Sequence, residues 1–297
     1  MIHKIGFIGL GIMGKAMASN LLKKGFEITG FVRRPEKLDE IKALGIKTAT
    51  SIPDVCAEAD CVITMVGGPD DVKEVWQGSN GVLASAKKGA LVIDMTSSSP
   101  ALAMELYEKG KTLGLRVLDA PVSGGDSGAK NATLSIFCGG DREDFEHALP
   151  VFEAMGRNIV LEGGPGRGQD TKLAAQIVVG GQLAGMCEGF AYAKERGLNL
   201  EKFASSLKGS AADCASLKLY SERVLNNDRS PGGALSYLVK DLKNALLALE
   251  GSGIDLNVTR EVLSNYQSMQ DRGMGSLGTQ ALVWDYAQRS GIKKQGH

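Results

Sequence analysis

A glycine-rich turn near the start of the chain constrains its fold more than any other feature. An apolar stretch, Lys4 to Ile8, runs into Gly9-Leu10-Gly11-Ile12-Met13-Gly14, and a helix-like segment follows. In Gly-x-Gly-x-x-Gly the first glycine permits a tight turn, the second lets a pyrophosphate approach the backbone, and the third lets helix and strand pack closely. The N-terminus of the following helix attracts phosphate. We therefore predict that residues 9–14 bind a dinucleotide; an ordinary strand–helix turn is the alternative.

The end of the second expected strand, residues 27–32, indicates which dinucleotide. A site for NAD usually has an acidic residue there, which accepts a hydrogen bond from the ribose 2′-hydroxyl. This chain has no acid at Val32 and continues with Arg33 and Arg34. Guanidinium groups suit a 2′-phosphate, because they donate charge-assisted and often bidentate hydrogen bonds. We predict NADP(H) rather than NAD(H), with Arg33 and Arg34 as ligands; a solvated basic turn is the alternative.

Composition excludes several classes of function. The 297 residues are 43% hydrophobic, enough for the cores of two domains. Lys and Arg number 34, as do Asp and Glu, so no net charge favours a nucleic acid or a membrane surface. No apolar run reaches the length of about 18 residues that a membrane helix needs. The five cysteines are scattered without metal-type spacing, so we expect reduced thiols, a cytoplasmic location and no metal site.

The first half of the sequence alternates apolar strands with amphipathic helices. This order predicts an α/β fold with a doubly wound, mostly parallel sheet, the Rossmann arrangement. Ligands of such sheets lie outside the carboxyl ends of the strands, which selects the loops 66–69, 96–100 and 121–125. We expect Met65 and Val66 to lie near the nucleotide and Thr96 near the nicotinamide ribose.

The second half changes character after Gly163-Gly164-Pro165-Gly166. A long helix is expected from about Gln169 to Arg196, followed by five shorter helical segments and almost no strand signals. We predict two domains: a dinucleotide-binding domain over residues 1–166 and a C-terminal all-α domain over residues 167–297.

Three further motifs carry a family resemblance. They are Asp119-Ala120-Pro121-Val122-Ser123-Gly124-Gly125, Gly166-Arg167-Gly168-Gln169-Asp170-Thr171-Lys172 and Val239-Lys240-Asp241-Leu242. With the glycine turn, they make the chain resemble the β-hydroxyacid dehydrogenases, such as 3-hydroxyisobutyrate dehydrogenase and tartronate semialdehyde (2-hydroxy-3-oxopropionate) reductase, over essentially its whole length. The resemblance implies an oxidoreductase in which NAD(P) exchanges a hydride with a small, carboxylate-bearing hydroxy acid. It also implies a homodimer or homotetramer.

The resemblance assigns roles to individual residues. Lys172 matches the family's catalytic lysine, which accepts or donates the proton of the substrate hydroxyl as the hydride moves. Ser123, Gly124 and Gly125 form a loop whose backbone N–H groups suit a substrate carboxylate, and a structural glycine turn is the alternative. Lys240 matches a lysine that reaches the cofactor, whereas we expect its neighbour Asp241 to be structural.

One departure from the family pattern bears on activity. The family usually has Lys-x-x-Asn after the catalytic lysine, and here that position is Ala175. Gln176, one residue later, is on the same helix face and is our candidate substrate ligand in its place. Two alternatives stay open: a non-catalytic NADP-binding scaffold or impaired paralogue, and an enzyme like the imine reductases. Imine reductases usually lack this lysine, so the presence of Lys172 disfavours that alternative.

Overall fold

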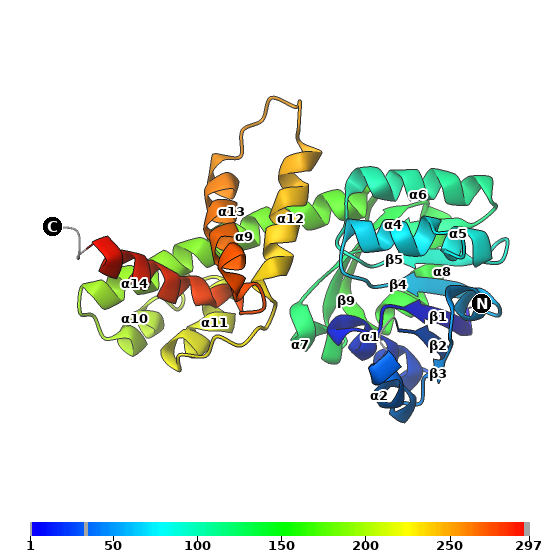
Figure 1. The fold of residues 1–297 in the computed structure, drawn as a ribbon, viewed down its shortest axis with the longest axis horizontal. Helices are drawn as coiled ribbons and strands as arrows, with labels where there is room; N and C mark the ends of the chain where they lie inside the picture. Colours follow the sequence, from blue (N-terminus) through cyan, green and yellow to red (C-terminus); the bar gives the residue numbers. More distant parts are fainter. Residues whose placement is uncertain (1, 33–34, 294–297) are drawn as a thin grey trace. The chain divides into compact units, whose positions relative to one another are not determined.

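The computed structural model describes residues 2–32 and 35–293, so Arg33 and Arg34 lie outside the described residues. The chain divides into two compact units, one that ends at Leu173 and one that starts at Ala174 (Figure 1). The division falls inside a long helix, whose first turns pack with the first unit. The predicted boundary at residues 166 and 167 lies just before this helix.

The first unit contains a nine-stranded sheet in its described residues. Its strand order is β3-β2-β1-β4-β5-β6-β8-β7, and β9 pairs with β8. The pairs from β3 to β6 are parallel, β6–β8 and β7–β8 are antiparallel, and β8–β9 is parallel. The first six strands thus have the order 3-2-1-4-5-6, which reverses direction between β1 and β4. The predicted doubly wound α/β class is confirmed. The strands are β1 (Lys4–Ile8), β2 (Glu27–Phe31), β3 (Lys47–Thr48), β4 (Cys61–Thr64), β5 (Leu91–Asp94), β6 (Arg116–Asp119), β7 (Val122–Ser123), β8 (Leu134–Gly140) and β9 (Gly156–Gly163).

Helices cover both faces of this sheet, as a doubly wound fold requires. Buried residues of α1, α2, α7 and α8 belong to one hydrophobic cluster, and those of α3, α4, α5 and α6 belong to another. Ser99 caps the N-terminus of α6, where its hydroxyl accepts a hydrogen bond from the Leu102 N–H. The helices are α1 (Ile12–Lys23), α2 (Leu38–Ala43), α3 (Ile52–Cys56), α4 (Pro69–Gln77), α5 (Val82–Ser85), α6 (Pro100–Thr112), α7 (Gly125–Lys130) and α8 (Arg142–Glu153), with a 3₁₀ turn at Pro35–Lys37.

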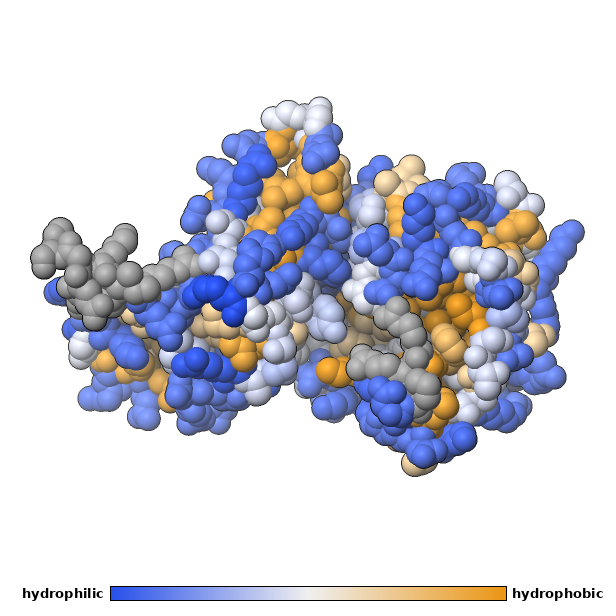
Figure 2. Space-filling view, in the orientation of Figure 1, coloured by the Kyte–Doolittle hydropathy of each residue, from blue (hydrophilic) through white to orange (hydrophobic). Residues whose placement is uncertain are grey.

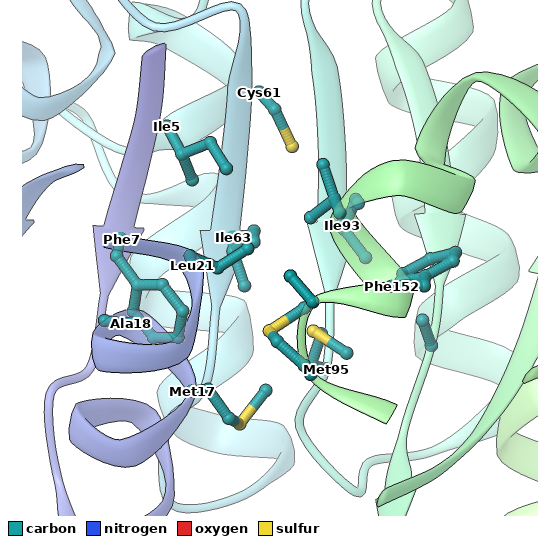
Figure 3. Packing of buried hydrophobic residues seen from close by; sticks show 14 of the residues in the cluster. Ile5, Phe7, Met17, Ala18, Leu21, Cys61, Ile63, Ile93, Met95 and Phe152 are labelled. Atoms are coloured by element: carbon teal, nitrogen blue, oxygen red, sulfur yellow. The ribbon is translucent and has the colours of Figure 1, made fainter. Parts of the chain in front are cut away.

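Alternation along each strand divides the core between the two faces. In β1, Phe7 faces the cluster beneath α1 and α8, whereas Ile8 faces the cluster beneath α4 and α6. Ile63 and Ile93 join Phe7 on the first face (Figure 3). Both faces are apolar because both are covered, which explains why these strands read as continuous hydrophobic runs in the sequence.

Helices make up the regular secondary structure of the second unit in its described residues, as predicted, apart from one isolated antiparallel bridge between Ala234 and Gly278. Its core includes Phe190 of α9, Leu242 of α12 and Tyr266 of α13, all fully buried. Figure 2 shows hydrophobic residues exposed over α12 and α13, where Leu247 and Val258 are among the exposed large side chains. The elements are α9 (Arg167–Glu195), which starts in the first unit, α10 (Leu200–Ser206), α11 (Ala215–Leu225), α12 (Leu235–Ala248), α13 (Asn257–Met269), a π-helical turn (Gln270–Met274), a 3₁₀ turn (Thr279–Ala281) and α14 (Leu282–Lys293).

Candidate functional site

The glycine turn joins β1 to α1. Gly9 has a φ of +96°, and a Cβ there would clash with the carbonyl oxygen of Met65. A Cβ on Gly14 would clash with the carbonyl oxygen of Gly9 and lie 2.9 Å from the Phe7 ring. The fold itself therefore requires these two glycines. Gly11 differs, because it has an ordinary φ of −76° and a Cβ there would meet nothing within 4 Å.

Gly11 thus leaves the backbone open next to the first turn of α1. That helix begins at Ile12, has no acidic residue in its first turn and has no side-chain cap. Its N–H groups and dipole would favour a phosphate there, so the turn fits the pyrophosphate of a dinucleotide. The neighbouring side chains differ in position: Leu10 is buried in the core, Met13 is partly buried, and Ile12 is 65% exposed.

The carboxyl ends of β1, β4 and β5 meet beside this turn. Gly9 lies against Met65, which follows β4, and the N–H of Val66 donates a 3.0 Å hydrogen bond to the Thr96 hydroxyl. Thr96 follows β5 and is buried. The structure therefore brings together the glycine turn, Met65, Val66 and Thr96 at the edge where the strand order reverses, as the sequence predicted for a ligand site.

A series of buried hydrogen bonds stabilises this edge of the sheet. The Trp76 indole donates to the Thr64 hydroxyl (3.0 Å), and the Thr64 hydroxyl donates to Asp94 (2.8 Å). The same Asp94 oxygen accepts the Thr96 N–H at 3.1 Å. Burial raises the pKa of Asp94 to about 6, although the hydrogen bonds from Thr64 and Thr96 oppose that rise.

A second buried carboxylate, Asp119 at the end of β6, holds the start of α9. Its two oxygens accept the N–H groups of Gly166 and Gln169, each at 2.8 Å. Burial raises the pKa of Asp119 to about 6 as well. Accepting N–H groups at the N-terminus of a helix satisfies donors that have no partner inside the helix. Asp119 thus fixes where α9 begins.

Gln169 links the same turn of α9 to the loop after β5. Its side-chain amide donates to the Thr96 carbonyl (2.8 Å) and accepts from the Ser98 N–H (2.7 Å). Sequence reasoning assigned no role to Gln169, although one signal was present: Gln169 and Lys172 are spaced i, i+3, which places both on one helix face. The contacts with Asp119, Thr96 and Ser98 are distant in sequence and carried no such signal.

Lys172 follows on the same face of α9. Its exposed fraction is 6%, and its neighbour Leu173 is 3% exposed. Lysine is rarely this buried, because its long side chain normally keeps the ammonium group in water. The structure therefore places Lys172 in a protected position and not on a solvated helix surface.

The loop after β7 has the backbone shape that glycine permits. Gly124 and Gly125 have φ values of +132° and +61°, and both residues are exposed. Ser123 pairs with Ser135 of β8 and is partly buried. The loop thus has an exposed main chain at Gly124 and Gly125, directly after Ser123.

In the helical unit, Gln176, Lys240 and Asp241 form a polar cluster. The Gln176 amide donates to one oxygen of Asp241 at 2.8 Å, and the Lys240 ammonium lies 3.3 Å from the other. The Asp241 side chain is 4% exposed and that of Lys240 is 23% exposed. Asp241 therefore orients the Gln176 amide through a hydrogen bond and forms an ion pair with Lys240. Ala175 is partly buried and adds no polar group.

Other kinds of site receive no support from the described residues. No group of three or more His, Cys, Asp or Glu side chains there could hold a metal ion. In the same part of the chain, no helix combines the length and apolarity required to cross a membrane. All five cysteines are free thiols, and all except Cys214 are buried.

Comparisons with known families identify the chain. Residues 4–164 match the NAD-binding domain of 6-phosphogluconate dehydrogenase, and residues 166–285 match the NAD-binding domain of NADP-dependent 3-hydroxyisobutyrate dehydrogenase. Together they span the glycine turn, the Asp119–Gly125 segment and Lys172. The chain belongs to the β-hydroxyacid dehydrogenase family. It is thus an oxidoreductase of the NAD(P)-dependent kind.

Similar proteins cover this β-hydroxyacid dehydrogenase nearly end to end. An uncharacterized oxidoreductase of Bacillus subtilis is 42% identical over 95% of this chain and 98% of its own length. The 2-hydroxy-3-oxopropionate reductase of Escherichia coli is 35% identical over 94% of this chain and 96% of its own. A solved structure of Mycobacterium tuberculosis 3-hydroxyisobutyrate dehydrogenase with L-serine superposes with a TM-score of 0.87. It is 30% identical and covers 96% of this chain and 99% of its own.

Proposed function

We propose that this β-hydroxyacid dehydrogenase uses NADP(H) to interconvert a small aldehyde acid and the corresponding hydroxy acid. The names of its relatives support this substrate class, since one is a 3-hydroxyisobutyrate dehydrogenase and another a 2-hydroxy-3-oxopropionate reductase. A cytoplasmic location and assembly into a homodimer or homotetramer remain predictions from the sequence.

The residues of the first unit fit a dinucleotide. When bound, the nicotinamide supplies or accepts the hydride. The turn at residues 9–14 would hold the pyrophosphate, and Met65, Val66 and Thr96 would flank the rest of the molecule. The choice of NADP(H) over NAD(H) rests on Arg33 and Arg34, whose guanidinium groups suit a 2′-phosphate.

The observation that carries the proposal is the burial of Lys172. Burying a charged group costs several kcal/mol, and lysine side chains are seldom as buried as that of Lys172, so its burial calls for a functional explanation. In its neutral form the amine accepts the substrate hydroxyl proton during oxidation. In its charged form it donates that proton to the carbonyl oxygen during reduction. We therefore assign Lys172 as the general acid and base.

The remaining ligands follow from chemistry and from the family resemblance. Ser123, Gly124 and Gly125 would bind the substrate carboxylate through backbone N–H groups and the serine hydroxyl. Gln176 would contact the substrate with the face of its amide that Asp241 does not occupy, and Lys240 would contact the cofactor. The hydrogen bond between Gln176 and Asp241 supports an active site in which Ala175 is not a defect, because the helix still carries an oriented amide.

Steady-state kinetics test this proposal. NADPH and NADH are each offered with tartronate semialdehyde and with succinic semialdehyde, and NADP⁺ with 3-hydroxyisobutyrate. We expect turnover of at least one of these acids, with a higher kcat/KM for NADP(H). NADPH binding without turnover of any of them would contradict the proposal and favour the scaffold alternative. Turnover of cyclic imines alone would favour an imine reductase.

A further inference from the structure

We propose that Gln169 is a positioning residue for proton transfer: it clamps the first turn of α9 to the loop at residues 96–98 and so sets the position of Lys172. The inference rests on the proposed role of Lys172 as the general acid and base. It concerns a residue that does not itself contact substrate.

The contacts of Gln169 use its backbone and both ends of its side chain. The residue is fully buried. Its N–H donates to Asp119, its Nε2 donates to the Thr96 carbonyl, and its Oε1 accepts from the Ser98 N–H. The carbonyl of Thr96 and the N–H of Ser98 both bind the same side-chain amide. Gln169 thus makes the pair of hydrogen bonds that a neighbouring strand makes with a strand backbone. The side-chain amide of glutamine offers a donor and an acceptor in one fixed plane without carrying a charge.

The spacing along α9 connects this clamp to the amine. Lys172 lies three residues after Gln169, on the same buried face of the helix. Thr96, at the other end of the clamp, is the residue expected beside the nicotinamide ribose. One side chain thus joins the turn that carries the proton donor to the loop expected beside the hydride donor. An error of about 1 Å in such an arrangement costs about 100-fold in rate, which is why a rigid link here matters.

Charged groups around Gln169 make an isosteric substitution informative. Asp119 accepts its N–H, Asp94 accepts the N–H of Thr96, Asp170 is adjacent in sequence, and Lys172 follows one turn later. A neutral glutamic acid at position 169 keeps one donor for Thr96 and one acceptor for Ser98. An ionised one has no donor and repels the Thr96 carbonyl. The three nearby carboxylates favour the neutral form, whereas Lys172 favours the ionised form.

The experiment compares Gln169→Glu and Gln169→Leu with the wild-type holoenzyme and with Gln182→Leu, a change of a partly buried glutamine farther along α9. The Leu variant should lose about 10- to 100-fold in kcat at every pH. Its NADPH dissociation constant should stay within about threefold of wild type, since a positioning role spares ground-state binding. The Glu variant should be near wild type at low pH and lose activity as its carboxyl ionises, which adds a new step to the pH profile of kcat. Gln182→Leu should leave kcat and the profile unchanged.

Hydrogen exchange gives a readout that does not depend on turnover. In the wild type the Ser98 N–H is hydrogen-bonded to Gln169 and should exchange slowly, whereas Gln169→Leu should expose it and Gln182→Leu should not. The proposal is overturned if both Gln169 variants keep kcat within about twofold with no new ionisation. It is also overturned if kcat falls only in proportion to the loss of NADPH affinity. Failure of both variants to fold at any pH would overturn it as well, because Gln169 would then be purely structural. Absence of turnover in the wild type would instead refute the proposed function, while unchanged Ser98 exchange would refute the clamp.

Discussion

Glycine serves different purposes in the two units of this molecule. In the first unit, Gly9, Gly14 and Gly168 lie where one backbone crosses another, because a Cβ on any of them would run into a carbonyl oxygen. In the helical unit, Gly181 and Gly185 of α9 would place a Cβ where nothing lies within 4 Å. The first kind of glycine fixes a turn or a close approach. The second kind only weakens a helix, since glycine costs about 1 kcal/mol relative to alanine there.

The largest effect on stability should come from adding a Cβ to one of the glycines that lie against a carbonyl oxygen in the first unit. Gly168→Ala places a Cβ 2.8 Å from the Asp119 carbonyl oxygen and against the Phe137 carbonyl. Both obstacles are backbone atoms, so the chain must shift. We expect a loss of about 3–5 kcal/mol in the free energy of unfolding, measured by urea denaturation. A loss within experimental error would show that the start of α9 can move freely, contrary to this account.

The buried carboxylates make the first unit sensitive to pH. Burial raises the pKa of Asp94 from 3.8 to about 6. Between those values the native state holds a proton that the unfolded state has released, so this residue's contribution to stability falls as the pH rises. Asp94→Asn removes this effect and keeps an oxygen for Thr64 and Thr96. The free energy of unfolding of the variant, minus that of the wild type, should therefore rise by about 3 kcal/mol between about pH 4 and about pH 6. Denaturation of both proteins at each pH measures this difference. A constant difference across this range would contradict the assignment.

The chemistry contributed by the helical unit can be tested at Gln176. Gln176→Ala removes the amide that Asp241 orients. Losing a hydrogen bond to a charged substrate costs about 1.5–3 kcal/mol, so we expect KM for the acid substrate to rise about 10- to 100-fold with NADPH affinity unchanged. Ala175→Asn is the matched variant and should change kcat/KM little. A large gain in activity from Ala175→Asn would instead support the decayed-site alternative.

The smallest effect should come from a glycine of the second kind. Gly185 is exposed in the middle of α9. Gly185→Ala should raise the free energy of unfolding by about 1 kcal/mol, because alanine restricts the unfolded chain and suits a helix. Thermal unfolding of the two proteins measures this gain. A marked destabilisation would show that Gly185 is a close-contact glycine like those of the first unit.

Much of the fold was predictable because its signals are local. The strand, glycine turn and helix at residues 4–24 are adjacent in sequence, and both faces of the sheet are apolar, so the strands stand out. The strand β9 was missed because its exposed Arg157 and Asn158 break the apolar pattern. The turns α3 and α5 were too short to show a helical period.

The positions of some candidate site residues were also predictable. The glycine turn follows from its motif, Thr96 from its place after a strand and Lys172 from the family resemblance. The structure places the glycine turn and Thr96 at one edge of the sheet, and the roles of all three stay predictions. The links that hold the site were not predictable. Asp119 contacts Gly166 and Gln169, and Gln169 contacts Thr96, across 47 to 73 positions of sequence. Pairings of that kind depend on the folded sheet and leave no periodic trace in the chain.

The most direct test of the account is the turnover of Lys172→Ala beside Lys194→Ala, which removes an exposed lysine from the far end of the same helix. We expect Lys172→Ala to lower kcat by about 10²–10⁴ while it still binds NADPH, and Lys194→Ala to behave as wild type. If Lys172→Ala instead turns over aldehyde acids at a rate close to that of Lys194→Ala, proton transfer does not depend on this buried amine and the proposed mechanism is wrong.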